Sequence, residues 1–299
     1  MKNFIYKIGY FLFPIISFIF LYFLLIIFST NYIRNNSTFY SIDSEIETLF
    51  LGDSHISHAI NDALVPSSKN LAKPAEPYYY SYHKLKFFTN TNSKINKIYL
   101  GFSYHSLSSS YDEFINGMFS SNIGPPYFFI LPFKEQLRLL YWNRKSIMYF
   151  FKKLFNVLID HINDEYKRNT SLYHGFDNFY PKSCINQDSI SDRINFQYYV
   201  KNRSEILDPA DLNYFYFNKI IKYCVQNDLN IKLISTPIHN KNYERIPLSY
   251  KKLLKNYKDS NFIDFTLLIK EDCKFSPDGD HVSIKGAEVT TLSFLKKFN

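Results

Sequence analysis

Glycine is scarce in this chain, with only 8 among 299 residues. No glycine-rich loop that could cradle a phosphate is present, and no nucleotide-binding motif is found. Half of the glycines, Gly52, Gly101, Gly279 and Gly286, fall in three short segments. Because glycine reaches backbone conformations that a Cβ obstructs, this placement indicates special backbone demands there. We therefore expect a functional site in these segments.

Cysteine is also rare, and three widely spaced residues exclude both a disulfide framework and a zinc-binding cysteine pattern. Cys224 lies on an apolar helical face and is predicted to be a buried thiol, whereas a Cys184–Cys273 bridge is left open. His55 and His58 are three residues apart, but no carboxylate or cysteine pattern completes a metal ligand set around them. The sequence therefore predicts no metal and no cofactor.

The net charge of +8 is basic, but the chain lacks a compact Lys/Arg cluster interleaved with stacking aromatics. Phe, Tyr, Ile, Lys and Asn are abundant together, and all five are favoured by AT-rich codons, which accounts for both the charge and the 19% aromatic content. A basic surface favours anionic lipid or an acidic glycan as readily as nucleic acid. Without a nucleic-acid-binding motif, we predict that nucleic acid is not a partner.

The amino-terminal segment predicts on which side of a membrane the chain lies. Ile8 to Phe28 contains 21 consecutive residues without a charge, enough to cross a hydrocarbon core of about 30 Å as a helix. Lys2 and Lys7 precede it, which places the amino terminus in the cytoplasm and the rest of the chain outside. No small-residue cleavage site follows, so residues 1–30 are predicted to be an uncleaved transmembrane signal anchor, with a cleaved signal peptide as the alternative. Residues 31–45 are polar and predicted to be a tether.

Residues 46–299 alternate apolar runs with helical patterns, which predicts an α/β domain with a parallel sheet. A flavodoxin-like three-layer α/β/α arrangement with five strands fits this alternation, with the site on loops at the carboxyl ends of the strands. The predicted strands are 46–51, 70–72, 95–102, 231–234 and 262–265, and the predicted helices begin at or near Pro77, Asp208, Tyr250 and Ser283.

Residues 106–207 do not follow the alternation and are predicted to be an insertion. This segment is rich in aromatic and polar residues, and it contains one amphipathic stretch from Phe133 to Ile159. The insertion either caps the site and takes part in recognition, or serves as a structural cover alone. The sequence leaves both readings open.

Two short motifs at opposite ends of the domain carry the chemistry. Leu51-Gly52-Asp53-Ser54-His55 presents a serine at a small-residue turn directly after the first predicted strand. Asp278-Gly279-Asp280-His281 places an acid three residues before a histidine, in a loop ahead of the last predicted helix. A nucleophilic serine needs a base that takes its proton and an acid that orients the base. One rigid loop could supply both the base and the acid.

The pair of motifs resembles the SGNH (GDSL-like) hydrolase family over residues 46–105 and 208–298. The resemblance implies the same three-layer fold, with Ser54 as nucleophile, His281 as general base and Asp278 as the acid that orients it. Spacing alone also allows Asp280 in that last role. Gly52 and Asp53 are expected to support the turn, and His55 either lines the pocket or begins a helix.

The family completes its oxyanion hole with a glycine N–H from a second block and an asparagine from a third. The second block here is 70–75, where Ala72 and Ala75 stand without a glycine, and a backbone N–H survives if the alanine reaches the required φ. The third block is 101–105, which lacks the asparagine, so Ser103 or His105 would have to donate instead. Losing one such donor costs about 10²–10³ in rate. The motif Gly-x-Ser-x-Gly is absent, which argues against an α/β-hydrolase.

The resulting expectation is an extracytoplasmic, membrane-anchored serine esterase or O-acyltransferase that acts through an acyl-enzyme. Its expected substrate is an acyl ester of a cell-envelope polysaccharide, and an envelope acyl-transfer partner fits the same role. The alternative is a catalytically weak or inactive SGNH-like binding or scaffold protein in envelope polysaccharide assembly. A lipid-directed esterase or thioesterase is a third reading.

Overall fold

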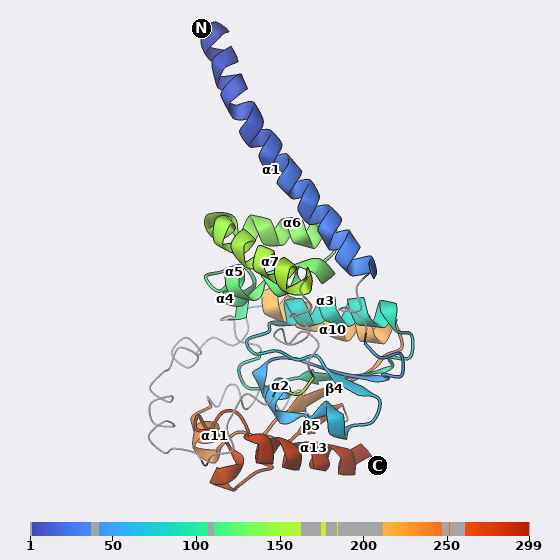
Figure 1. Ribbon diagram of the computed structural model, residues 1–299. Coiled ribbons are helices and arrows are strands. Elements are labelled where there is room, and N and C mark those ends of the chain that lie inside the picture. The colour runs from blue at the N-terminus through green and yellow to red at the C-terminus, as the bar shows by residue number, and fades with distance from the viewer. Residues whose placement is uncertain are drawn as a thin grey trace. The chain divides into compact units, whose positions relative to one another are not determined.

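The computed structural model describes residues 2–36, 42–106, 111–162, 175–177, 184, 212–246, 251 and 261–298 (Figure 1). The chain divides into two compact units, Met1–Ser41 and Ile42–Asn299. The first unit contains one helix, α1 (Lys2–Asn36), with Pro14 inside it. No helix in the described part of the chain is both long and apolar enough to cross a membrane. The prediction of a transmembrane helix over Ile8–Phe28 is therefore not supported.

The second unit is built on a sheet of five parallel strands in the order β2-β1-β3-β4-β5. This confirms an α/β domain with a five-stranded parallel sheet. The strands are β1 (Thr48–Leu51), β2 (Ser68–Asn70), β3 (Lys97–Gly101), β4 (Asn230–Ser235) and β5 (Phe262–Asp264). All four residues of β1 are buried, as expected for a central strand covered on both faces.

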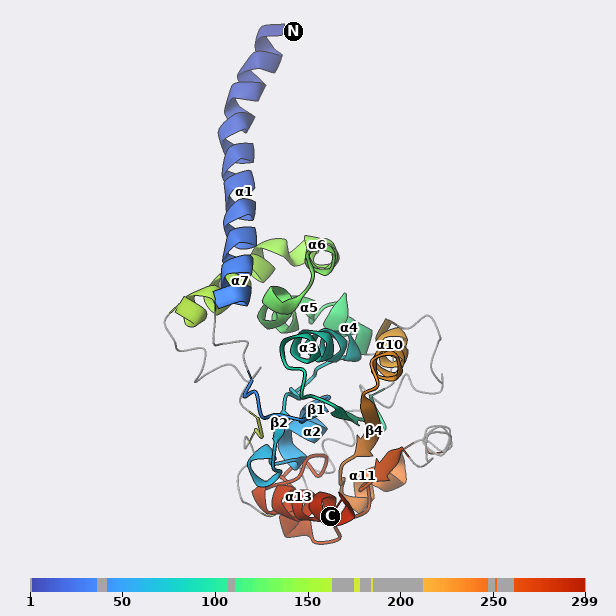
Figure 2. The same ribbon diagram turned by 90° about the vertical axis from the view of Figure 1, so that its right-hand side faces the viewer.

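Helices cover both faces of the sheet (Figure 2). On one face α3 (Tyr78–Thr91) packs against α10 (Leu212–Gln226), and on the other α2 (Ser54–Ala59) packs against α13 (Ile284–Phe298). The shorter α11 (Asn240–Arg245) follows β4, and two 3₁₀ turns lie at η2 (Asp62–Leu64) and η6 (Asp272–Lys274).

The helix starts that the sequence predicts at Pro77 and Ser283 are confirmed by the structure. Pro77 is the N-cap of α3, with φ near the value that its ring imposes. Ser283 stands directly before α13, where its Oγ accepts a hydrogen bond from the N–H of Gly286 at 3.3 Å. The predicted start at Asp208 lies outside the described residues, as does the helix expected at 250–257, apart from Lys251.

The insertion is helical between Asp112 and Ile162. Its elements are α4 (Asp112–Ile115), α5 (Ser120–Ile123), η4 (Pro125–Ile130), α6 (Phe133–Trp142), η5 (Arg144–Ser146) and α7 (Ile147–Ile162). Within the predicted amphipathic stretch Phe133–Ile159, the helix is broken at Asn143, whose side-chain amide donates to the Leu139 carbonyl at 2.9 Å. Beyond α7, only 175–177 and Cys184 of the insertion are described.

A buried polar cluster connects the insertion to the α/β core. Lys84 on α3 donates to the Glu76 carboxylate and to the Leu71 carbonyl, and both charged side chains are fully buried. Tyr127 from the insertion donates to the same carboxylate at 2.7 Å. Ser81 donates to its other oxygen at 2.6 Å. Each of these polar groups has a hydrogen-bond partner within the cluster. Removal of one charged side chain therefore leaves the other charge buried and unpaired.

The substitution Lys84→Met tests this cluster. It leaves the Glu76 carboxyl buried without its cation, so we expect the free energy of unfolding to fall by about 3–5 kcal/mol in urea denaturation. Lys84→Met combined with Glu76→Gln removes the unpaired charge and should recover most of that loss. Equal stability of the single and double variants would contradict the assignment.

Candidate active site

The turn after β1 is shaped by the close approach of two strands. Gly52 has φ of +137°, and a Cβ placed on it would lie 3.1 Å from the Cα of Gly101 at the end of β3. A side chain at Gly52 would therefore be strained by both backbone conformation and contact. These two glycines allow the carboxyl ends of β1 and β3 to approach closely, two residues before Ser54, the first residue of α2.

The side chain of Asp53 stabilises this turn through hydrogen bonds. It is the N-cap of α2, and its Oδ1 accepts a hydrogen bond from the N–H of His55 at 3.0 Å. Its Oδ2 accepts from Nε2 of His105 at 2.8 Å and from the hydroxyl of Tyr111 at 2.9 Å. Burial alone would raise the pKa of Asp53, but His105 and these hydrogen bonds hold that pKa well below its usual range. The buried carboxylate is thus fully occupied in supporting the turn.

Ser54 and His281 meet although 227 positions separate them in the chain. His281 Nε2 lies 2.7 Å from Ser54 Oγ, and His281 Nδ1 lies 2.9 Å from Asp278 Oδ2. The other oxygen of Asp278 accepts from the N–H groups of Asp280 and His281, each at 3.0 Å, and from the Ser276 hydroxyl at 2.6 Å. The Asp278 carboxylate is therefore rigidly held, and it gives His281 one orientation toward Ser54.

Asp280 occupies a different place. Its Oδ1 accepts a hydrogen bond from the hydroxyl of Tyr104 at 3.1 Å and lies 3.7 Å from Nε2 of His55. The sequence spacing allowed either aspartate to orient His281, and it is Asp278 that contacts the His281 ring. Asp280 instead lines the site beside His55, whose Nδ1 is 3.3 Å from Thr236 Oγ1.

Four histidine rings gather around the serine. The His55 ring centroid lies 4.9 Å from that of His281 and 4.5 Å from that of His105, and the His58 centroid lies 5.3 Å from that of His281. His58 Nδ1 is 2.8 Å from the carbonyl of Asp177 in the insertion. Burial lowers the pKa of His58 to about 4, so the ring is neutral near pH 7. His58 was not among the predicted site residues, although its position four residues after Ser54 on a helix was a usable signal.

One group of side chains has metal-ligand chemistry. Donor atoms of His55, Asp280 and His281 lie within 4.8 Å of one another. His281, however, is hydrogen-bonded on one side to Ser54 and on the other to Asp278. The arrangement therefore suits proton transfer through His281.

Three of the four residues predicted to supply oxyanion donors hydrogen-bond to other groups of the protein. The N–H of Ala72 donates to Asn70 Oδ1 at 3.0 Å, and the N–H of Ser103 donates to Ser106 Oγ at 2.9 Å. The His105 ring is bound to Asp53, as described above. The Ala72 and Ser103 N–H groups and the His105 ring therefore each have a hydrogen-bond partner within the protein.

Ala75 differs from those residues. It has φ of +57°, a left-handed backbone conformation that glycine adopts easily and alanine rarely does. Its loop is tied to the turn because the N–H of Lys73 donates to the Gly52 carbonyl at 3.0 Å. We therefore take the backbone N–H groups of Ala75 and Ser54 as the candidate oxyanion donors.

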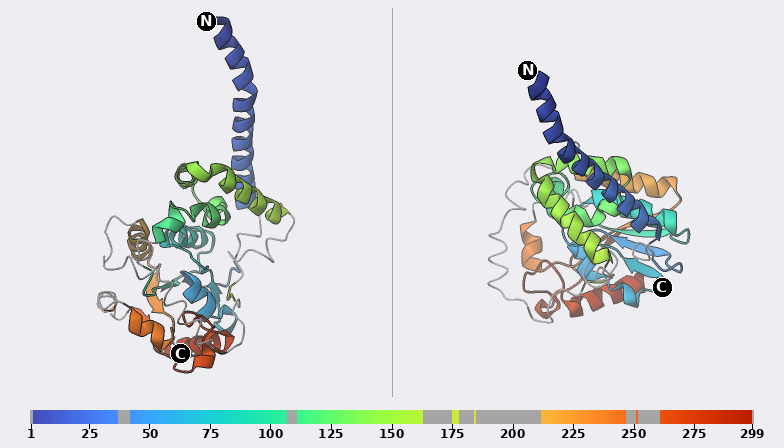
Figure 3. Two further views of the ribbon diagram at one scale, coloured as in Figure 1. Left: turned by 90° about the vertical axis from the view of Figure 1, so that its left-hand side faces the viewer. Right: turned by 45° about the horizontal axis from the view of Figure 1, so that its top comes forward.

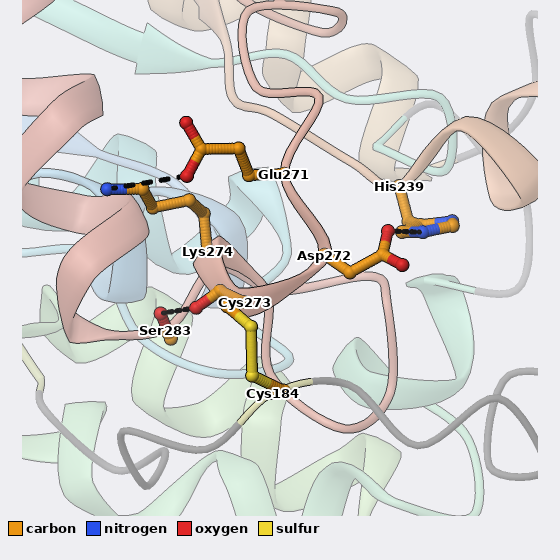
Figure 4. Close-up of a disulfide and its surroundings, with 7 residues drawn as sticks. All are labelled: Cys184, His239, Glu271, Asp272, Cys273, Lys274 and Ser283. Atoms are coloured by element: carbon orange, nitrogen blue, oxygen red, sulfur yellow. Dashed lines mark hydrogen bonds and ion pairs between the residues drawn. A yellow bond between two sulfur atoms is a disulfide. The ribbon is translucent and has the colours of Figure 1, made fainter.

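The loop that carries Asp278 and His281 is anchored by a disulfide. Cys273 in η6 is bonded to Cys184 of the insertion (Figure 4), which decides the pairing that the sequence left open. Beside it, Asp272 Oδ1 accepts from Nε2 of His239 at 2.8 Å. Cys224 is the free cysteine and is buried, as predicted, and burial raises the pKa of its thiol to about 12.

Comparisons with known proteins add little to this geometry. No family model matches the chain, and no curated protein matches it. One solved structure, described as "a putative platelet activating factor from Streptococcus pneumonia", is similar with a TM-score of 0.32 and 13% identity, over 96% of this chain and 99% of that chain. A likeness at this level carries no argument, so the case for the site depends on its own residues.

The depressed pKa of His58 predicts a pH effect on stability. Between its usual value near 6.5 and about 4, the unfolded chain binds a proton on His58 that the folded protein does not, so stability falls as pH falls through that window. His58→Gln removes this contribution and should flatten the slope of the unfolding free energy by up to about 1.4 kcal/mol per pH unit. Urea denaturation at pH 7, 6 and 5 measures it. Parallel slopes for the variant and the parent would show that His58 is not buried in its neutral form.

Proposed function

We propose that this protein is an SGNH-type serine esterase or O-acyltransferase that works through an acyl-enzyme. The observation that carries the proposal is the hydrogen-bonded series from Ser54 Oγ through His281 to Asp278, at 2.7 and 2.9 Å. The first distance lies within the range in which a general base takes a proton directly from its nucleophile, and the second is that of a hydrogen bond that orients the base.

In the first half-reaction, Ser54 Oγ attacks the acyl carbonyl carbon while His281 Nε2 takes the hydroxyl proton. Asp278 holds the Nδ1–H of His281 and stabilises the imidazolium that forms. The N–H groups of Ser54 and Ala75 are the donors to the oxyanion. When the tetrahedral intermediate collapses, the ester C–O bond breaks and the leaving alkoxide takes the proton from His281, which leaves an acyl-Ser54 ester.

In the second half-reaction, a hydroxyl compound enters where the alcohol left. His281 takes the proton of this hydroxyl group, and the hydroxyl oxygen attacks the acyl carbon. The bond between the acyl carbon and Ser54 Oγ then breaks as Ser54 regains a proton. Water in this role gives ester hydrolysis, and a sugar hydroxyl gives acyl transfer. The same residues serve both outcomes, which therefore depend on what reaches the acyl-enzyme.

The proposed substrate is an acyl ester of an envelope polysaccharide, and the proposed location is outside the cytoplasm. The Cys184–Cys273 disulfide supports the location, because disulfides persist in oxidising compartments and are rare in the cytosol. The polysaccharide substrate is inferred from the predicted uncleaved anchor, which resembles that of superfamily proteins that move or remove acyl groups on envelope polymers, and the structure does not support that anchor.

A binding or scaffold role is the second candidate. It is favoured by one specific observation: the third block lacks the expected asparagine, and His105 in that block is bonded to Asp53. Absence of this donor weakens stabilisation of the oxyanion by a factor of about 10²–10³. The retained contacts among Ser54, His281 and Asp278 favour the enzyme.

Labelling of the full chain with a fluorophosphonate probe tests the enzyme. The probe is expected to phosphonylate Ser54 Oγ, with loss of fluoride, and Ser54→Ala should abolish labelling. His281→Ala should lower its rate by at least about 10³-fold, and Asp278→Asn by a comparable factor, because the base is lost or misoriented. Asp280→Asn is the matched control, since the hydrogen bond to His281 Nδ1 comes from Asp278, and it should keep most of the labelling.

Failure of the folded parent protein to label would overturn the enzyme and leave the binding role. Equal losses in Asp278→Asn and Asp280→Asn would contradict the assignment of the acid. If the parent labels, comparison of acetate and octanoate esters separates a short-acyl enzyme from a lipid-directed esterase.

Thiol counting tests the location. Cells are quenched with acid, and their protein is denatured and treated with a maleimide reagent. One thiol, that of Cys224, should react if the Cys184–Cys273 bond is formed. Cys184→Ser combined with Cys273→Ser gives the one-thiol standard on a gel. Three reactive thiols in the parent protein would place the chain in a reducing compartment.

A further inference from the structure

The outward sides of α6 and α7 carry apolar residues that the rest of the unit does not cover. Both helices lie at the end of the unit away from α13 (Figures 1 and 3). Their exposed large apolar side chains, here called the α6–α7 face, are Phe133, Leu137, Tyr141, Met148, Tyr149, Phe155 and Ile159. Tyr141 is 64% exposed and Met148 is 78% exposed, so these residues project well beyond the helix backbone.

The spacing shows that each helix has two apolar sides. On α6, Phe133, Leu137 and Tyr141 follow each other at four-residue intervals, whereas Leu139 on the other side is buried. On α7, Met148, Phe155 and Ile159 form one stripe, while Phe150, Leu154 and Val157 are buried in the unit. The buried side accounts for the folding of the helices, and the exposed side needs another explanation.

Positive charge surrounds this face. Residues 133–162 contain six basic side chains and two acidic ones, and one of the acids, Glu135, is paired with Arg138 at 2.9 Å. Lys152 lies within the α7 stripe, and Lys145 lies at the connection between the helices; both are exposed. Arg144 stacks on the Tyr141 ring with its guanidinium 4.6 Å from the centroid.

Exposed aromatic and aliphatic residues within a basic border are the features of a helix that lies in the plane of a membrane interface. Its apolar side enters the boundary of headgroups and acyl chains, and its long basic side chains reach phosphate groups. We propose that the α6–α7 face binds the surface of an anionic lipid bilayer. This contact involves helices remote from Ser54 in sequence and does not depend on the proposed reaction.

A single tryptophan makes the proposal testable in the full chain. Trp142 is the only tryptophan, so Trp142→Phe gives a background in which one new tryptophan reports one place. In that background, Phe155→Trp places the reporter on the α6–α7 face. Leu292→Trp is the matched control on α13, where Leu292 is 46% exposed.

We expect vesicles of anionic phosphatidylglycerol and phosphatidylcholine to shift the emission of Trp at position 155 to shorter wavelength. Lipids brominated near the headgroup should quench it, and the reporter at position 292 should show neither effect. Each lysine near an anionic surface contributes about fivefold to partitioning. Lys145→Gln with Lys152→Gln should therefore raise the vesicle concentration for half-maximal shift at position 155 up to about 25-fold.

Three results would overturn the proposal. Identical responses at positions 155 and 292 would show that lipid does not bind this face. A shift that grows with protein concentration without lipid would assign the face to a second copy of the chain. An emission at position 155 that is already blue-shifted in dilute, lipid-free protein would show that another part of the same chain covers it.

Discussion

The buried carboxylate of Asp53 is the interaction on which the rest of the site depends. It caps α2 through the N–H of His55, and it accepts hydrogen bonds from His105 after β3 and from Tyr111 in the insertion. These partners come from separate segments, so one side chain fixes the position of the nucleophile relative to both. Burial raises the pKa of this carboxyl, but its interactions with His105 and its hydrogen bond from Tyr111 hold the pKa low, so the group stays ionised.

The site combines a well-formed proton path with a reduced set of oxyanion donors. Ser54, His281 and Asp278 are linked by short hydrogen bonds, whereas His105, in the third block, is committed to the turn. Ala75 retains the left-handed backbone that a glycine adopts easily, at a cost of about 1–2 kcal/mol. A conformation of that cost persists only where the surrounding structure holds it, and the Lys73–Gly52 hydrogen bond provides such a restraint.

Prediction from sequence was most accurate for buried, periodic segments and least accurate at edges. The strand expected at 46–51 begins only at Thr48, and the one expected at 70–72 is found as Ser68–Asn70. The second strand is polar and lies at the edge of the sheet. Its register is set by pairing with β1, and its residues carry no hydrophobic pattern from which the strand bounds could be predicted. The amphipathic stretch in the insertion was detected, but its division into α6 and α7 depends on local bonds at Asn143.

The sequence by itself determined the α/β class, the serine at a glycine turn, and an acid and a histidine close enough to share a loop, because each is encoded by local spacing and backbone preference. The resemblance favoured Asp278 as the acid, and tertiary structure shows its hydrogen bond to His281; tertiary structure alone decided that His105 supports Asp53, and that His58 and Tyr104 join the site. It also paired Cys184 with Cys273. Apart from the Asp278–His281 pair, which shares one loop, those contacts join residues tens to hundreds of positions apart, and only the packing of the sheet and its helices brings them within bonding distance.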